Sequence, residues 1–475
     1  MIEFGSIING KQVKGSEWID VFNPYTNKKV GRVASIDLPT LDQVLKDTKN
    51  TKITLTRYER YEILNKIAGA LEERVDEVSQ MITDETGLCL KDTRYEASRV
   101  SDVLRFSAMK TLDDDSQVFP CDVSKNGKPR RIYTTRVPLG LISAITPFNH
   151  PMNQVVHKIA PAIATNNTVV LKPSERTPLS AYYFAQLALD CGLPPNMLNV
   201  VNGIDIQATG KMMTVHPDIT LVSFTGSSHI GKKIAQKSGY KKVILELGGS
   251  SALLVLEDAD VDEAVEITMA GTFKNSGQRC TAIRRILVHM SIADAYASKL
   301  ANCVNNLKYG DPYNAENDMG TVINELSAIE IESRVQNAID NGAVLLAGHK
   351  REGALYTPTV LDHVQNSHEV VAKETFGPVA PIIRFSTLDE AIEIANDTPY
   401  GLSGGVVSNH WPSIQRVITE LDTGTVNVNE APSYRLEWTP FGGVKDSGLG
   451  YKEGVIETMK GYTNIKTYSL PWDIV

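Results

Sequence analysis

The chain has 475 residues, of which 42% are hydrophobic and 22% are charged, and its formal net charge is −8. These values are ordinary for a globular protein, and they exclude a disordered, collagen-like or coiled-coil chain. A mildly acidic chain is also a poor candidate for binding the phosphate backbone of nucleic acids. The length provides for two to four domains.

The cysteines and the apolar runs constrain the cellular setting. The five cysteines are odd in number and form no CxxC motif, which argues against a disulfide framework or a zinc site and is typical of a reducing compartment. The first residues show no secretory signal, and no apolar run reaches the ~18 residues of a membrane span. We therefore expect a cytoplasmic protein with no metal site, no membrane and no nucleic acid as partner.

The predicted elements change in character along the chain. The first 50 residues are strand-rich, and a helical pattern follows from about residue 56 to 110. Residues 119–138 read as two β-prone arms around Asn126-Gly127, which is a hairpin signal. Between residues 139 and 256, short apolar strands alternate with helices, and this predicts a parallel sheet covered on both faces. A second α/β pattern starts after residue 260, with helices at 292–307 and 326–341, and the last 30 residues are again β-prone.

Two short motifs carry groups suited to acyl chemistry. Cys280 ends the segment NSGQRC, where a guanidinium and backbone N–H groups would favour a thiolate. Glu246 ends an apolar strand and precedes Gly248 and Gly249, which suits a general base beside a close backbone approach. Each has a structural alternative when taken alone: a small buried thiol for Cys280 and a turn-forming carboxylate for Glu246.

Two other segments lie where doubly wound sheets bind dinucleotides. Gly226 and Ser227 come between a strand and a helix, whose N-terminus would suit a pyrophosphate. Lys172 and Glu175 follow a strand at the edge where ribose hydroxyls bind. The first segment departs from the GxGxxG motif of dinucleotide-binding proteins, and the second could be a charged surface turn. Neither segment alone establishes that the chain binds a dinucleotide.

These motifs occur together with TPFN at 146–149, ETFGP at 374–378 and PFGGVKDSGLG at 440–450. The set resembles the aldehyde dehydrogenase superfamily over essentially the whole chain. The resemblance implies an α/β fold with a Rossmann-like NAD-binding domain (1–118 and 139–250), an α/β catalytic domain (251–435) and a β oligomerisation arm (119–138 and 455–475). It also implies a homodimer or homotetramer.

The resemblance further implies a role for each motif residue. Cys280 would attack the aldehyde, the amide of Asn149 and the N–H of Cys280 would form the oxyanion hole, and Glu246 would activate the water that hydrolyses the thioester. Because Glu246 is present, a free acid is expected rather than a coenzyme-A thioester. A carboxylate at Glu175 would repel a 2′-phosphate, so NAD is expected rather than NADP. The implied cofactor contacts are Thr146, Pro147, Phe148, Lys172, Ser174, Glu175, Gly226, Ser227, Glu374 and Phe376.

Basic residues near these motifs point to an anionic substrate. Arg279 directly precedes the nucleophile, and Arg99 borders the buried stripe of a helix whose polar face carries Arg105, which we expect to be solvated. His157, seven residues further on, is the alternative to His150 as the histidine of the substrate pocket. Arg279 could instead pair with a structural carboxylate. The predicted substrate-binding residues are Arg99, His150, Arg279 and Arg435. Three buried positive charges and a titratable histidine are costly without a counter-ion, which a phosphonate or phosphate dianion would supply.

This arrangement resembles the family members that oxidise phosphonoacetaldehyde to phosphonoacetate, and we predict that reaction, which belongs to phosphonate metabolism. The second alternative is non-phosphorylating glyceraldehyde-3-phosphate oxidation, although an aromatic residue is more typical there at the position of His150. Sulfoacetaldehyde, phosphonoformaldehyde and lactaldehyde are lesser alternatives as substrates. A non-catalytic structural protein is a remote one, because Cys280, Glu246 and Asn149 are all present.

Overall fold

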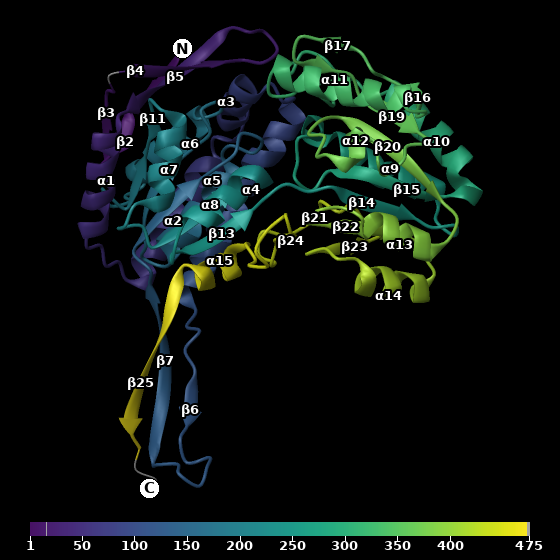
Figure 1. The fold of residues 1–475 in the computed structure, drawn as a ribbon. Coiled ribbons are helices and arrows are strands. Elements are labelled where there is room, and N and C mark those ends of the chain that lie inside the picture. The colour runs from purple at the N-terminus through teal and green to yellow at the C-terminus, as the bar shows by residue number, and fades with distance from the viewer. Residues whose placement is uncertain (16, 473–475) are drawn as a thin grey trace.

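The computed structural model describes residues 1–15 and 17–472. Two α/β halves lie side by side, and a slender arm extends from the first half (Figure 1). Each half is built on a seven-stranded sheet. The residue bounds of the domains expected from the sequence stay a prediction, and the sheets are described below by their strands.

The sheet of the first half has the strand order β13-β12-β8-β9-β10-β2-β3. The first five strands in that order run parallel, and β2 and β3 are antiparallel additions at the edge. Every residue of β8 and β9 is buried, as the continuous apolar runs in the sequence predict. The strands are β2 (Ser6–Ile8), β3 (Lys11–Val13), β8 (Leu141–Ile145), β9 (Thr168–Lys172), β10 (Leu198–Val200), β12 (Leu221–Thr225) and β13 (Lys242–Glu246).

The expected strands of the first 50 residues lie between Ile2 and Ile36, whereas the rest of that stretch, expected to be strand-rich, forms the helix α1 (Leu38–Asn50). Besides β2 and β3, a small sheet with the order β1-β5-β11 carries β4 on β5. Its members are β1 (Ile2–Phe4), β4 (Glu17–Phe22), β5 (Lys29–Ile36) and β11 (Asn202–Gly203).

The helical stretch expected from residue 56 to 110 is three helices. Thr56 and Glu59 form a capping box that starts the first of them, and Gly87, at φ +72°, ends the second in a left-handed conformation. The helices of the first half are α1 (Leu38–Asn50), α2 (Arg57–Glu72), α3 (Val75–Thr86), α4 (Leu90–Leu112), α5 (Asn153–Ala164), α6 (Leu179–Asp190), α7 (Ile206–Val215), α8 (Ser228–Lys237) and α15 (Val455–Gly461).

The sheet of the second half has the order β16-β19-β20-β15-β14-β22-β23, and all its pairs are parallel except β16 with β19. Its strands are β14 (Ser251–Val255), β15 (Ile283–His289), β16 (Val344–Ala347), β19 (Thr359–Asp362), β20 (Val379–Phe385), β22 (Gly404–Val407) and β23 (Val426–Val428). The helices are α9 (Val261–Phe273), the short 3₁₀ helix η1 (Lys274–Gly277), α10 (Met290–Asn305), α11 (Glu325–Asp340), α12 (Glu369–Ala372), α13 (Leu388–Asn396) and α14 (Trp411–Glu420). Two small ribbons complete the half: β17 (Arg351–Glu352) with β18 (Leu355–Tyr356), and β21 (Tyr400–Gly401) with β24 (Val444–Lys445).

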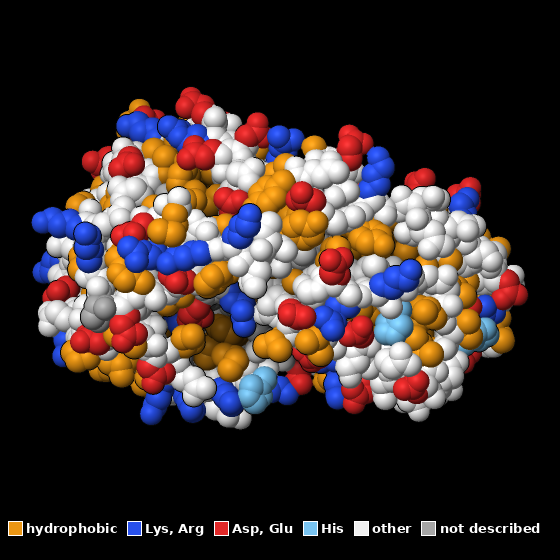
Figure 2. All heavy atoms as spheres, turned by 90° about the horizontal axis from the view of Figure 1, so that it is seen from above, with side chains coloured by type: hydrophobic (Ala, Val, Ile, Leu, Met, Phe, Trp, Pro, Cys, Tyr) orange, Lys and Arg blue, Asp and Glu red, His pale blue; other side chains and the backbone are white. Residues whose placement is uncertain are grey.

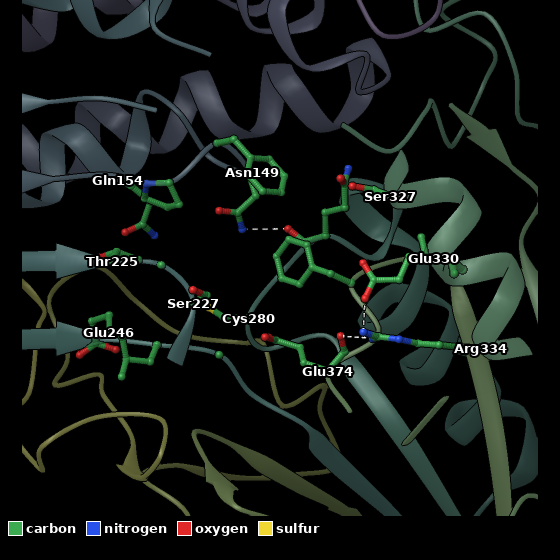
Figure 3. Close-up of a pocket in the computed structure, with 18 residues that line it drawn as sticks. Asn149, Gln154, Thr225, Ser227, Glu246, Cys280, Ser327, Glu330, Arg334 and Glu374 are labelled. Atoms are coloured by element: carbon green, nitrogen blue, oxygen red, sulfur yellow. Dashed lines mark hydrogen bonds and ion pairs between the residues drawn. The ribbon is translucent and has the colours of Figure 1, made fainter. Parts of the chain in front are cut away.

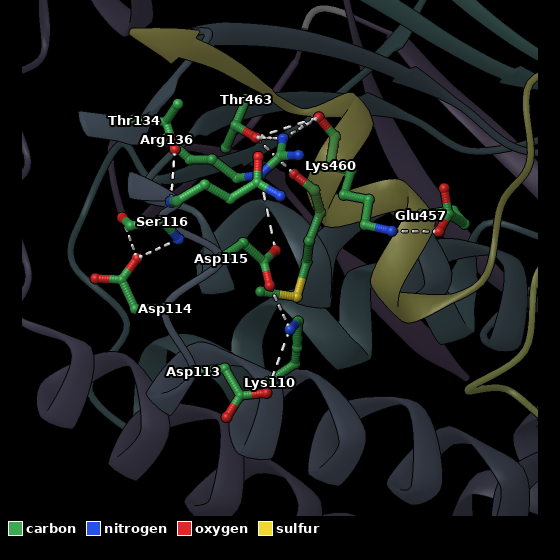
Figure 4. Close-up of polar contacts among 12 residues, drawn as sticks. Lys110, Asp113, Asp114, Asp115, Ser116, Thr134, Arg136, Glu457, Lys460 and Thr463 are labelled. Atoms are coloured by element: carbon green, nitrogen blue, oxygen red, sulfur yellow. Dashed lines mark hydrogen bonds and ion pairs between the residues drawn. The ribbon is translucent and has the colours of Figure 1, made fainter. Parts of the chain in front are cut away.

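The arm is a three-stranded sheet of β6 (Val118–Pro120), β7 (Arg130–Pro138) and β25 (Thr463–Pro471). Its base is fixed to the body by Arg136, which donates to the carbonyl of Lys460 and the hydroxyl of Thr463 and pairs with Asp115 (Figure 4). The hairpin expected around Asn126-Gly127 is confirmed, since β6 and β7 pair antiparallel on either side of it, and Gly127 closes a turn within the loop that joins them.

The C-terminal range expected for the arm, 455–475, contains two elements. Its first part is α15, a helix that packs against α4 and α5, and the strand of the arm starts at Thr463. Residues 473–475 of that range lie outside the described residues.

The surface seen from above carries acidic and basic side chains intermixed (Figure 2). None of the helices in the described part of the chain is long and apolar enough to cross a membrane.

Candidate active site

A cavity of about 270 Å³ lies between the two halves. Side chains of the first half, among them Asn149, Ser227 and Glu246, lie on one side of it, and Ser327 and Arg334 of α11 lie on the other (Figure 3). Cys280 lies among them. The structure therefore brings the three expected catalytic residues, Asn149, Glu246 and Cys280, to one cavity.

The nucleophile candidate follows a strained turn. Within η1, Asn275 and Ser276 have φ of +61° and +51°, and Gly277 follows at φ +69°. A Cβ at position 277 would lie 2.2 Å from the carbonyl oxygen of Gly377, so only glycine fits there. The turn carries the chain over the cavity and leaves Cys280 facing it.

The expected thiolate at Cys280 is wrong for the protein alone. Burial raises the pKa of the Cys280 thiol to about 11, although Arg435 and Arg279 act to lower it. Desolvation of the sulfur outweighs the neighbouring positive charges. The thiol is therefore neutral near pH 7, and a base must remove its proton before it can attack.

Asn149, which the resemblance implies as an oxyanion donor, lines the same cavity as Cys280. Its amide Nδ2 donates to the carbonyl of Gln278 at 2.8 Å and lies 3.3 Å from Nδ1 of His150. The carbonyl of Asn149 accepts from the side-chain amide of Asn275 at 2.9 Å. One N–H of the Asn149 amide is thus fixed, and the second can serve His150 or a developing oxyanion.

Glu246, the last residue of β13, is a buried carboxylate whose two oxygens have no hydrogen-bond partner among the described residues. Burial, and then the charge of Glu453, raise the pKa of Glu246 well above its usual range. Behind it, the buried Lys158 pairs with Glu453 at 2.8 Å and donates to Ser223 at 3.0 Å. A carboxyl group with a raised pKa is suited to take up and release protons near neutral pH.

The residues expected to hold the cofactor phosphates fit a dinucleotide. Ser227 caps the N-terminus of α8 by accepting from the N–H of Ile230, and Gly226 and Ser227 line the cavity. The hydroxyl of Thr225, which also lines the cavity, is buried without a partner among the described residues. A helix N-terminus and an unpaired hydroxyl facing one cavity suit a pyrophosphate.

The other expected cofactor residues fall in two groups. Lys172 ends β9 and forms an ion pair with Glu175, and Ser174 lies in the same turn. Thr146, Pro147 and Phe148 follow β8, and the ring of Phe148 meets that of Phe376 edge-on at 5.9 Å. Glu374 accepts the N–H of Gly249 at 3.0 Å. All of Pro147, Phe148, Gly226, Ser227, Glu374 and Phe376 line the cavity.

The predicted arginines do converge, but around a carboxylate that the sequence reasoning missed. Glu437 forms an ion pair with Arg99 and lies 3.8 Å from Arg435. The expectation that the arginines have no counter-ion in the protein is therefore wrong. Arg279, by contrast, makes no side-chain hydrogen bond or ion pair among the described residues, although the charges of Arg99 and Asp92 act on it. Arg105 pairs with Glu72 on the surface, as its place on the polar face predicts.

His150 is half-buried beside these arginines. Burial, and then the charges of Arg279, Arg99 and Arg435, hold the pKa of His150 well below its usual range. A lowered pKa favours the neutral imidazole, which can still donate through one ring N–H, so His150 stays a predicted donor. The alternative, His157, is fully buried and bonds Glu437 through Nε2. The sequence offered one indication that Glu437 belongs to the site: it follows Arg435 by two residues on the same loop.

Comparison with known proteins agrees with this geometry. Residues 11–468 match the model of the aldehyde dehydrogenase family. The chain belongs to the aldehyde dehydrogenase family. Its relatives include a 3-sulfolactaldehyde dehydrogenase of Priestia megaterium, 36% identical over 453 residues (95% of this chain and 94% of the relative). A lactaldehyde dehydrogenase of Methanocaldococcus jannaschii is 36% identical over 471 residues (97% of this chain and 98% of the relative).

Solved structures support the same fold. The NADP-dependent glyceraldehyde-3-phosphate dehydrogenase of Bacillus halodurans, complexed with NADP, superposes with a TM-score of 0.94 and 32% identity, covering 100% of both chains. The protein is therefore an NAD(P)-dependent aldehyde dehydrogenase.

Proposed function

We propose that the protein oxidises phosphonoacetaldehyde to phosphonoacetate with NAD. The observation that carries the proposal is the charge beside Cys280 and His150, from residues that do not themselves line the 270 Å³ cavity. One carboxylate, Glu437, accompanies three guanidinium groups there, and Arg279 keeps its donors unpaired among the described residues. Arg279 directly precedes the nucleophile. An anion on the carbon next to the aldehyde would lie within reach of a group so placed, and arginine offers it a bidentate fork.

The reaction follows from the groups of the site. Glu246 takes the proton of the Cys280 thiol, and the sulfur attacks the carbonyl carbon to give a thiohemiacetal. The amide of Asn149 and the N–H of Cys280 hold the resulting oxyanion. When bound, the dinucleotide supplies the acceptor for the hydride that leaves this carbon, and a thioester remains on Cys280. Glu246 releases the first proton to solvent and then takes a proton from the water that attacks the thioester. The carbon–sulfur bond breaks, the acid departs, and the sulfur regains its electron pair and takes the proton back from Glu246.

The cofactor preference rests on Glu175. In the proposal, Lys172 and Glu175 hold the adenosine ribose, with the carboxylate accepting from its hydroxyl groups. A 2′-phosphate would bring negative charge against that carboxylate. NAD is therefore proposed as the cofactor, whereas the Bacillus halodurans relative is complexed with NADP.

A sulfonate aldehyde is the second candidate, and two observations favour it. Glu437 cancels part of the positive charge of the arginines. A monoanion requires less positive charge for its binding than a dianion does. The relative from Priestia megaterium is a 3-sulfolactaldehyde dehydrogenase. Sulfonate and phosphonate share a tetrahedral group of oxygens, so charge is the feature on which the pocket can separate them.

The test is kcat/KM with NAD for phosphonoacetaldehyde, sulfoacetaldehyde, glyceraldehyde 3-phosphate and acetaldehyde under one set of conditions. The proposal predicts at least about 100-fold preference for phosphonoacetaldehyde over acetaldehyde, the value of two charge-assisted hydrogen bonds. A higher value for sulfoacetaldehyde would support the second candidate. Equal values for acetaldehyde and the anionic aldehydes would show that the arginines are structural and would overturn both.

A further inference from the structure

Two carboxylates of α4, Asp92 and Glu96, lie close to the active site. Neither lines the cavity, and neither forms an ion pair with Arg99, Arg279 or Arg435. Asp92 and Glu96 are four residues apart and so lie on the same face of the helix. Glu96 is 2% exposed. Each of them accepts hydrogen bonds from the backbone of a segment that carries a candidate catalytic residue.

Glu96 caps a helix from outside it. Its Oε1 accepts the N–H groups of Met152 and Asn153, both at 3.0 Å. These are the first N–H groups of α5, and the N-cap residue, Met152, supplies no side-chain cap of its own. A carboxylate also interacts favourably with the positive end of the helix dipole. The chain enters α5 directly from Asn149 and His150, so Glu96 fixes the end of the turn that bears the oxyanion amide.

Asp92 holds the other turn. Its Oδ2 accepts the N–H of Asn275 at 2.7 Å. Asn275 and Ser276 are both in the left-handed region, a strained conformation for these residues that persists only where the surroundings fix the backbone. The turn leads into Cys280 five residues after Asn275.

The two turns are also tied to each other. The side-chain amide of Asn275 donates to the carbonyl of Asn149 at 2.9 Å, and the amide of Asn149 donates to the carbonyl of Gln278 at 2.8 Å. The two turns are therefore hydrogen-bonded to each other, and one face of α4 is hydrogen-bonded to both of them. A shift of either turn would change the position of the sulfur of Cys280 relative to the amide of Asn149.

We propose that Asp92 and Glu96 are positioning residues that keep the nucleophile turn and the oxyanion turn in register. The proposal rests on the roles proposed above for Cys280 and Asn149. Loss of either acceptor leaves backbone N–H groups unpaired and lets its turn move. A displacement of about 1 Å at the reacting atoms is enough to slow chemistry by about 100-fold.

The chain offers a matched control in Glu85. This glutamate is likewise buried and caps a helix from outside it, accepting the N–H groups of Leu179 and Ser180 at the start of α6. It holds neither of the two turns. Removal of Glu85 and removal of Glu96 therefore delete the same kind of interaction, but only Glu96 bears on the oxyanion turn.

The experiment measures the single-turnover rate constant of NADH formation with acetaldehyde at saturating NAD, together with the melting temperature. We expect Glu96→Ala and Asp92→Ala to lower the rate constant at least tenfold. Glu96→Gln should stay within about threefold of the wild type, because its Oε1 still accepts both N–H groups. Glu85→Ala should lose melting temperature as Glu96→Ala does but keep the rate constant.

Two results would overturn the proposal: a rate constant for Glu96→Ala and Asp92→Ala within twofold of the wild type, or an equal loss in Glu85→Ala. If Glu96→Ala fails to fold, Glu96→Asp replaces it, since one methylene less withdraws the acceptor and predicts at least a fivefold loss. Cys280→Ser, measured in parallel, distinguishes failure of the positioning proposal from failure of the proposed function. NADH formation by that variant would refute the proposed function itself, whatever the α4 variants do.

Discussion

Replacing Arg279 by alanine removes the one arginine of the cluster that has no protein partner among the described residues. Nothing in the fold loses a hydrogen bond to that side chain, so the melting temperature should change little. An anionic aldehyde, however, would lose a bidentate, charge-assisted contact. Each bond to a charged group contributes about 1.5–3 kcal/mol, so two of them correspond to a loss of about 100-fold or more in kcat/KM.

Arg279 also acts on the thiol of Cys280, whose pKa it helps to lower. A neutral aldehyde separates the two effects, because it reports on the thiol alone. The quantity to measure is therefore the ratio of kcat/KM for phosphonoacetaldehyde to that for acetaldehyde, in the wild type and in Arg279→Ala. We predict that the ratio falls about 100-fold.

The matched control is Arg105→Ala, which removes an arginine that pairs with Glu72 on the surface. That variant should keep the wild-type ratio. If Arg279→Ala lowers kcat/KM equally for both aldehydes, Arg279 serves the thiol and not the substrate, and the reasoning from the unpaired guanidinium is refuted.

Three other predictions follow from the site. Glu246→Gln should leave the first turnover of NADH slower but detectable and reduce steady-state turnover by about 10²–10⁴-fold; unchanged steady-state turnover would remove Glu246 from the mechanism. Glu175→Gln should raise the ratio of kcat/KM with NADP to that with NAD about tenfold, since it removes the charge facing a 2′-phosphate; a constant ratio would place the 2′ position elsewhere. Burial raises the pKa of Glu96 to about 7 from its ordinary 4.5. A carboxyl whose pKa is raised in the folded state stabilises it below pH 4.5, and this contribution is lost as the pH rises to about 7. The free energy of unfolding of the wild type should therefore fall by up to about 3 kcal/mol across that window, and that of Glu96→Gln should not. Denaturant unfolding at pH 5 and pH 8 measures the difference. An equal change in both proteins would contradict the raised pKa of Glu96.

Local patterns predicted much of the fold because they report local physics. The continuous apolar runs of β8 and β9 indicated buried parallel strands, and both are fully buried. The polar face of α4 indicated a solvated Arg105, and it is solvated. Asn126-Gly127 indicated a hairpin between its flanking arms, and β6 and β7 pair antiparallel on either side of it, joined by a loop longer than two residues.

The site was harder to predict where its properties depend on distant parts of the chain. The sequence places Glu437 only two residues from Arg435, but the contact with Arg99 spans 338 positions. The protonation states of Cys280 and His150 depend on burial, which raises one pKa and lowers the other, and a sequence read residue by residue carries neither effect. Asp92 and Glu96 act on the backbone of segments far away in the sequence, and the one local contact of Asp92, from the thiol of Cys89, gives no sign of this role.

The most direct test of the central claim is mass spectrometry of Glu246→Gln incubated with phosphonoacetaldehyde and NAD. With deacylation slowed, the account predicts that the peptide containing Cys280 gains the mass of a phosphonoacetyl group, and that this adduct needs NAD to form. An adduct on another cysteine, or none on Cys280 while NADH is produced, would contradict the account.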